Sequence, residues 1–341
     1  MISKNETKQL QGVAIIAMLC LHLFCTLEPP FTPLVYIGDT PLTYFIGQAA
    51  DCCVMIYCFC SGYGLMASYI SSKENGKEYL KGRLKGIFRL LKSYWIVLFL
   101  FVITAAIFGK TAEWLVSPVT FLGNFFIFWY TYNGAWWFIS TYILMVLLSP
   151  IVFKAVQKHP VIVAVVTPLI YLVSYLLRFK YVDGFLIQHV ARLGMSYAEL
   201  LIGVYFYKYI ILEKCEKIWN KIVPEKIYFV LLSLIVLLTI VLRRYTPTLF
   251  VAPFSGMIFI VCYLLAVRKF SVLSKPFEFF GSHSMNMWLT HMFFYFPVYG
   301  GLVYYAKYPI AIFAFLLLIS LIVSYIINVI SRIFVLKKRN V

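Results

Sequence analysis

The chain has 341 residues, of which 62% are hydrophobic and 13% are charged. Soluble domains carry about 25% charged residues, so the composition excludes an ordinary water-soluble protein. The formal net charge of +17 would suit nucleic acid, but the basic residues lie in short segments between apolar runs, where they orient membrane helices. We therefore predict an all-α, polytopic integral membrane protein that binds no nucleic acid.

Apolar runs long enough to cross a bilayer recur ten times along the chain. The predicted spans cover residues 8–27, 42–70, 93–109, 137–153, 161–177, 193–211, 227–242, 249–267, 284–301 and 310–334. Residues 121–130 are also apolar, but about ten residues are few for a crossing, so we predict a re-entrant or interfacial piece there. The segments between spans are short, so residues 1–341 are expected to form a single transmembrane domain with no appended soluble domain.

The distribution of lysine and arginine tests this topology. With the amino terminus in the cytoplasm, most of the 30 basic residues fall in cytoplasmic segments, as the positive-inside rule requires. The exceptions are Lys110, Arg178, Lys180, Arg192, Arg243, Arg244 and Lys307. Ten spans then leave both termini in the cytoplasm. An additional full span at 121–130 would invert the second half of the chain and destroy the agreement.

A histidine lies deep in the first span, in the run QLQGVAIIAMLCLHLF. It is His22, and Gln11 stands eleven residues before it. Eleven residues are close to three helical turns, so the two side chains share a face and lie roughly 16 Å apart. An ionisable side chain inside a membrane helix is costly and by default marks a functional site. The structural alternative is a histidine that only holds neighbouring helices together.

Asp51 lies in the outer half of the second span, where a lone carboxylate needs a partner or a proton. His22 is one available partner, because an aspartate would orient the imidazole and stabilise its charged form. Rotation of the helix would equally direct Asp51 toward Arg192. The sequence leaves both pairings open.

The run SGYG, residues 61–64, lies toward the cytoplasmic end of the same span. Two glycines within a helix cost stability unless another backbone must come close. The following segment, KEYLKGRLKGIFRLLKSYW, is predicted to be a basic loop and carries Arg83 and Arg89. Topology alone explains such charges, but arginine also binds phosphate through paired hydrogen bonds, which would suit a phosphate-bearing donor.

Polar residues recur on two later spans. Arg192 and Glu199 are seven residues apart, and therefore share a face of the sixth span. They form either an ion pair that fixes packing or a wall of an outward-facing cavity. Ser284, Trp288 and His291 share a face of the ninth span in the same way. A polar packing stripe explains these three residues at least as well as catalysis does.

Eight cysteines are present, and most of them lie between Cys20 and Cys60. They form no CxxC pair, and thiolates would be costly in lipid. We interpret them as small apolar packing residues and expect no metal site.

Taken together, these segments resemble the acyltransferase-3 family of integral membrane acyltransferases, which modify glycans and other cell-surface molecules. The resemblance covers nearly the whole chain. It rests on the order and spacing of LQGVAIIAMLCLH, SGYGL, RLKGIFRLLKSYW, WWFISTYILMVLLSP, RLGMSYAELLIG and FFGSHSMNMWLTH. It implies an enzyme of the bacterial plasma membrane that transfers an acyl group from acetyl-CoA, or another acyl-CoA, to a hydroxyl on an extracytoplasmic glycan.

The resemblance also implies roles for individual residues. His22 matches the catalytic histidine of the family, as general base or as acyl acceptor, and Arg192 matches a polar position of the sixth span. Asp51 and Glu199 join this catalytic set because buried carboxylates are costly. We assign donor binding to Gln11, Ser61, Tyr63, Arg83 and Arg89, and acceptor binding to Trp137, Trp288 and His291. Family members usually carry a basic residue where this chain has Gln11, although glutamine can still form hydrogen bonds.

Two other functions fit the same sequence. A transporter or flippase for an acylated or lipid-linked glycan would move its substrate without consuming CoA, although no internal repeat of the kind found in many transporters is evident. A non-catalytic membrane module would tolerate replacement of both His22 and Asp51. Small polar packing faces would also allow a homodimer within the membrane lipid.

Overall fold

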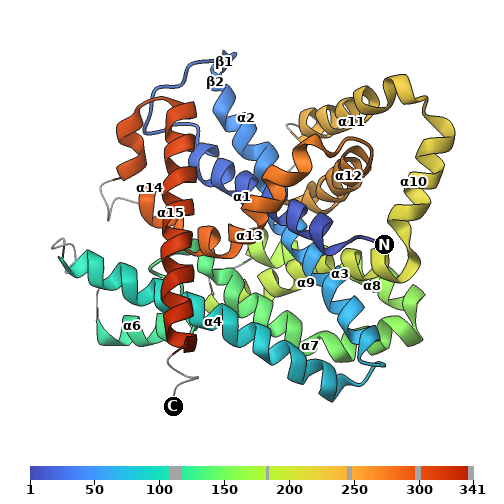
Figure 1. Cartoon of the computed structure of the whole chain (residues 1–341), viewed down its shortest axis with the longest axis horizontal. Helices are drawn as coiled ribbons and strands as arrows, with labels where there is room; N and C mark the ends of the chain where they lie inside the picture. The colour runs from blue at the N-terminus through green and yellow to red at the C-terminus, as the bar shows by residue number, and fades with distance from the viewer. Residues whose placement is uncertain (108–116, 182–183, 244–247, 296–300, 337–341) are drawn as a thin grey trace. The chain divides into compact units, whose positions relative to one another are not determined.

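The computed structural model describes residues 1–107, 117–181, 184–243, 248–295 and 301–336. Over these ranges the chain is almost entirely helical, and two short strands, β1 (Tyr36–Ile37) and β2 (Thr40–Pro41), pair antiparallel (Figure 1). Eight helical segments in the same ranges are long and apolar enough to cross a membrane, or nine if the bent pair α9 (Phe185–Tyr209) and α10 (Ile211–Ile222) forms one crossing. The predicted all-α, multi-span fold is confirmed, with a count close to ten.

Most predicted spans agree with helices to within a few residues. These helices are α1 (Lys4–Phe24), α7 (Trp137–Lys158), α8 (Pro160–Leu176), α11 (Tyr228–Arg243), α12 (Thr248–Lys269) and α15 (Pro309–Leu336). The second span is interrupted, because the 3-10 turn η1 (Ala50–Cys52) separates α2 (Leu42–Ala49) from α3 (Cys53–Ser71). Short 3-10 or π-helical turns connect other elements: η2 (Gly134–Trp136), η3 (Leu177–Tyr181), η4 (Glu225–Ile227), η5 (Ser271–Leu273) and η7 (Leu302–Ala306).

The basic segment before the third span is a helix, so the prediction of a loop was wrong. α4 (Gly76–Ile107) includes both Arg83 and Arg89 and continues into the apolar part. Its start is capped by Asn75, whose side-chain oxygen accepts hydrogen bonds from the backbone N–H groups of Lys77 and Glu78 at 3.1 and 3.3 Å, as at many helix N-termini. The predicted end of this span, Gly109, lies outside the described residues.

Two further predicted apolar segments form short or broken helices. α6 (Pro118–Phe125) has eight residues, too few for a crossing, and its interfacial or re-entrant placement stays a prediction. The predicted ninth span is broken: α13 (Ser274–Thr290) ends before His291, and α14 (Met292–Tyr295) follows. Residues 296–300 of that span lie outside the described part of the chain, as do the topology-setting residues Lys110, Arg244, Lys337, Lys338 and Arg339.

The chain packs into two compact units, each built from separate stretches of sequence. Unit 1 comprises Met1–Ala17, Gln48–Lys81 and Leu144–Ser282. Unit 2 comprises Met18–Gly47, Gly82–Ile143 and His283–Val341.

In unit 1, α1 and α13 cross at two glycines. A Cβ atom on Gly12 would clash with the carbonyl group of Phe277, and a Cβ on Gly281 would clash with the carbonyl group of Lys8. The two backbones therefore touch reciprocally, the arrangement that small residues allow between membrane helices.

A second close crossing joins α3 to α9 in the same unit. A Cβ on Gly62 would clash with the carbonyl group of Leu200, and one on Gly203 with that of Phe59. Gly64, two residues along, faces open space. The close approach expected for the SGYG run is thus made by the first of its two glycines.

Candidate active site

His22 and His291 are in direct contact within unit 2. His22 lies in the last turn of α1, and His291 occupies the break between α13 and α14. Nδ1 of His22 is 2.6 Å from Nε2 of His291, and the two rings are within 3° of parallel. His291 is fully buried, whereas His22 is half-buried. The fold thus brings together two residues that lie 269 positions apart.

The break at His291 is stabilised by side chains that precede α7. Asn133 Nδ2 and Trp136 Nε1 both donate to the carbonyl oxygen of Leu289, at 3.2 and 3.0 Å. The last four carbonyls of an α-helix lack a helical partner, and a buried carbonyl without a donor costs free energy. These two donors satisfy the carbonyl oxygen of Leu289 near the end of α13, and so help to fix the position of His291. Neither residue was predicted for the site, because nothing in the sequence around either one points to a contact with Leu289.

The neighbours of His291 determine the tautomers of both imidazoles. Nδ1 of His291 lies 2.9 Å from the carbonyl oxygen of Trp288 and 3.2 Å from that of Met287. Carbonyl oxygens only accept, so Nδ1 carries the proton and Nε2 of the neutral ring is an acceptor. Nδ1 of His22 is then the donor in the contact between the rings. This leaves the lone pair of His22 on its Nε2 atom.

An imidazole nitrogen with a free lone pair can accept a proton or attack an electrophilic carbon. Nε2 of His22 can therefore act as a general base, or as a nucleophile.

One aromatic ring lies near both histidines, and further aromatic side chains pack together on α7 and α13. The ring centroid of Tyr295 is 6.4 Å from each imidazole. Trp288 is buried on α13 and packs edge-to-face with Phe138 at 5.9 Å. Trp137, the first residue of α7, is half-buried next to the same phenylalanine, and Ser284 is buried on α13.

A polar seam between α13 and α15 was missed by the sequence analysis. Nδ1 of His283 is 2.9 Å from Oγ of Ser324, and Nδ2 of Asn286 is 2.9 Å from Oδ1 of Asn328. Ser320, one turn before Ser324, is also buried. The sequence does show a four-residue spacing of Ser320, Ser324 and Asn328 in the tenth span. This spacing predicts a polar helix face, but it does not tell which helix that face contacts.

Basic side chains follow the first half of α4 in unit 2. Arg83 is half-buried and interacts electrostatically with Tyr142. Lys85, Arg89 and Lys92 recur at intervals of four and three residues, so they share one helix face, on which Lys85 and Arg89 are exposed. Such a row of cations attracts anionic groups.

Asp51 belongs to unit 1, where it forms a buried ion pair with Arg243 at the end of α11. The same guanidinium donates to the carbonyl oxygen of Ala49 at 3.4 Å. His22 and Arg192 were the partners predicted from the sequence, and the pairing with Arg243 corrects that prediction. The partner of Asp51 depends on how the interrupted second span is rotated about its axis. Residue spacing within one helix does not reveal that rotation.

Glu199 and Arg192 lie on α9 in unit 1. Glu199 is buried and accepts a hydrogen bond from the thiol of Cys58 on α3, and Arg178 interacts with it electrostatically. Arg192 is half-buried. The partner that the structure gives for Glu199 is therefore a thiol on a neighbouring helix.

The predicted donor-binding residues of unit 1 already have local contacts. The hydroxyl of Ser61 donates to the carbonyl oxygen of Tyr57 one turn earlier, at 2.7 Å. The hydroxyl of Tyr63 accepts from the backbone N–H of Ile2 at 2.8 Å. Gln11 is half-buried on α1.

The eight cysteines are free thiols. Within the described ranges, no group of three or more His, Cys, Asp or Glu side chains could hold a metal ion.

A polytopic helical protein with a paired histidine near the end of its first crossing is a membrane protein equipped for proton transfer or nucleophilic chemistry. The model of the acyltransferase-3 family, described as an acyltransferase domain, matches residues 8–329. The chain belongs to this family and is a multi-pass membrane acyltransferase. No match was found among curated proteins or among solved structures.

Proposed function

We propose that the protein is an O-acyltransferase that moves an acetyl or another acyl group from acyl-CoA to a hydroxyl on an extracytoplasmic glycan or cell-envelope molecule. Membership of the acyltransferase-3 family supports the class of reaction. The observation that carries the proposal is the contact between His22 and His291, because it leaves a lone pair on Nε2 of a half-buried imidazole.

In the first form of the reaction, His22 is a general base. Its Nε2 atom takes the proton of the acceptor hydroxyl while the hydroxyl oxygen attacks the thioester carbonyl carbon. The C–S bond then breaks, and the imidazolium returns the proton to the sulfur, which yields the ester and free CoA. In the second form, Nε2 attacks the thioester carbonyl carbon, the C–S bond breaks and CoA leaves as its thiolate, which gives an acyl-imidazolium. The acceptor hydroxyl oxygen then attacks the acyl carbon, the C–N bond breaks and returns the electron pair to Nε2, and the hydroxyl proton is taken up by the CoA thiolate. His291 holds Nδ1–H of His22 in both forms.

The basic first half of α4 is the proposed region for binding the phosphates of the donor. CoA carries several phosphate charges, and a guanidinium binds phosphate through paired, charge-assisted hydrogen bonds. Arg83 and Arg89 are the residues assigned to this role. Trp137 and Trp288 are assigned to the acceptor, and both pack against Phe138 in the unit that holds the histidine pair.

The test uses the purified protein in proteoliposomes with labelled acetyl-CoA and an extract of envelope polysaccharide. Label should appear in base-labile esters, and CoA should be released in equal amount. The double variant Arg83→Gln/Arg89→Gln should raise the KM for acetyl-CoA at least tenfold, since each charge-assisted hydrogen bond contributes about 1.5–3 kcal/mol. The control Lys154→Gln/Lys158→Gln on α7 should leave it unchanged. Movement of glycan across the bilayer without CoA release would refute the transferase and favour a transporter.

A further inference from the structure

The helix α10 turns away from α9 by 70°. The turn is made at Ile210, whose backbone angles, φ 51° and ψ 47°, are left-handed. A β-branched residue rarely adopts this conformation, so contacts made by α10 must hold the bend in place. For a crossing that stands along the membrane normal, a helix turned 70° from it lies near the membrane plane, and α9 belongs to the predicted sixth crossing.

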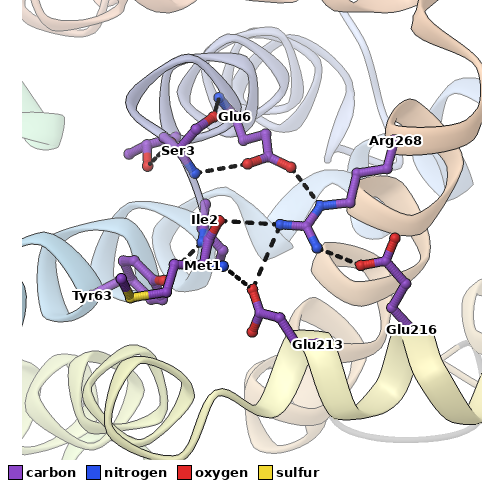
Figure 2. A network of polar contacts seen from close by, with 9 residues as sticks. Met1, Ile2, Ser3, Glu6, Tyr63, Glu213, Glu216 and Arg268 are labelled. Atoms are coloured by element: carbon purple, nitrogen blue, oxygen red, sulfur yellow. Dashed lines mark hydrogen bonds and ion pairs between the residues drawn. The ribbon is translucent and has the colours of Figure 1, made fainter.

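Charge fixes the inner face of α10 within unit 1. Figure 2 shows Glu213 and Glu216 of α10 directed toward Arg268 of α12. Nη1 of Arg268 is 2.6 Å from Oε2 of Glu216, and its Nε is 2.6 Å from Oε1 of Glu6 on α1. Glu213 also contacts the amino group of Met1. Both acidic side chains of α10 are therefore held by cations on the inner side.

Apolar packing holds the same face. Leu212 is buried, and Trp219 packs edge-to-face against Tyr228 at the start of α11, with ring centroids 6.0 Å apart. These contacts orient the helix about its own axis. The remaining side chains must therefore point away from unit 1.

The outward side chains of α10 are basic or large and apolar. Lys214, Lys217 and Lys221 recur at intervals of three and four residues and are exposed, so they form one row. Ile218 and Ile222 lie beside this row and are 58% and 70% exposed. Exposed isoleucines next to lysines, on a helix near the membrane plane, are the pattern of an interfacial helix.

We propose that this outer face of α10 binds anionic phospholipid at the membrane surface. The isoleucines enter the boundary of the acyl chains, and the three ammonium groups pair with lipid phosphates. Charge complementarity selects anionic over zwitterionic lipid, since each lysine near an anionic surface contributes about fivefold to binding, or roughly a hundredfold for three. The surface is independent of the proposed transferase site, and its test needs no activity.

The experiment is hydrogen–deuterium exchange of the full chain in nanodiscs of phosphatidylcholine, with and without phosphatidylglycerol. Amides of residues 211–222 should exchange at least severalfold more slowly when phosphatidylglycerol is present. The triple variant Lys214→Gln/Lys217→Gln/Lys221→Gln should lose this difference, whereas the corresponding triple arginine variant should keep it. A charge-matched control, Lys154→Gln/Lys158→Gln/Lys275→Gln, removes three exposed lysines outside α10 and should also keep it.

Equal exchange in both lipids would overturn the proposal, as would a lipid effect that survives the glutamine variant. Loss of the effect in the control would also overturn it, because net charge rather than α10 would then be responsible. Inorganic phosphate added to phosphatidylcholine nanodiscs should give no protection. Protection by phosphate alone would mean that α10 binds a free anion instead of a lipid.

Discussion

The ion pairs of unit 1 and the histidine pair of unit 2 differ in how ionisable side chains meet. In unit 1 charge meets charge, as Asp51 pairs with Arg243 and Arg268 with Glu6. In unit 2, His22 donates a hydrogen bond to His291, which in turn donates to the carbonyl oxygen of Trp288. This leaves the lone pair on Nε2 of His22 unused. A buried ion pair keeps its charges in place, since separating them is costly, whereas an imidazole readily gains and loses a proton. The contrast fits the proposed function, in which the ion pairs of unit 1 support the fold and the paired rings of unit 2 take part in the reaction.

The largest effect is expected from replacing His22, the proposed general base or acyl acceptor. His22→Ala should lower acyl transfer about a thousandfold, in the range of general-base contributions, while the protein still folds into membranes. Labelled acetyl-CoA in proteoliposomes measures the rate, and gel filtration in detergent checks the fold. Transfer at the wild-type rate would show that the lone pair on His22 is not used.

Breaking the charged pair of unit 1 should affect stability instead. Arg243→Met leaves Asp51 buried without its cation and should lower the free energy of unfolding by about 3–5 kcal/mol. The double variant Asp51→Leu/Arg243→Met removes both charges and should recover most of that loss. Thermal unfolding in detergent is the measurement. A stable double variant that cannot transfer acyl groups would return Asp51 to a direct role in catalysis.

Variants of His291 test whether this residue positions His22 or only fills space beside it. His291→Leu removes the acceptor for Nδ1–H of His22 and should lower kcat about a hundredfold with little change in KM. His291→Gln retains an acceptor oxygen and should lose less. Nitrogen chemical shifts of His22 should report a single tautomer in the wild type and a mixture in the leucine variant. Equal kcat values for the two variants would argue against the tautomer assignment.

The smallest effect is expected on stability, from alanine substitutions at two glycines of α3 that differ in their surroundings. Gly62→Ala pushes the backbone of α9 away and should cost about 1–3 kcal/mol of stability. Gly64→Ala meets open space and should raise stability by up to about 1 kcal/mol, because alanine favours the helix. Melting temperatures of the purified variants make the comparison. Matching values would contradict the close crossing of α3 and α9.

The membrane helices were predictable because hydropathy reports a property of each segment by itself. The first, fourth and tenth spans, for instance, agree with α1, α7 and α15 to within a few residues. The segment before the third span was misjudged because the end of an apolar run is not the end of a helix. Lysine, arginine and leucine are all good helix formers, so α4 extends back to Gly76.

The geometry of the candidate site was less predictable, because it depends on contacts between distant parts of the chain. His22 stood out as an ionisable residue in lipid, but nothing near it in sequence points to His291. The break before His291 is stabilised by Asn133 and Trp136, about 150 residues earlier, and neither attracts notice by charge. The partner of Asp51 likewise depended on how η1 rotates the residue.

The crossing of α1 and α13 at Gly12 and Gly281 limits how the enzyme can be redesigned. Each glycine lies against the carbonyl group of the other helix, so even one added methyl group must separate two main chains. A saturation library should therefore lose nearly every substitution at these two positions, whatever acyl group is selected for. Engineers who seek a new donor or acceptor specificity should keep both glycines and vary the side chains around the histidine pair.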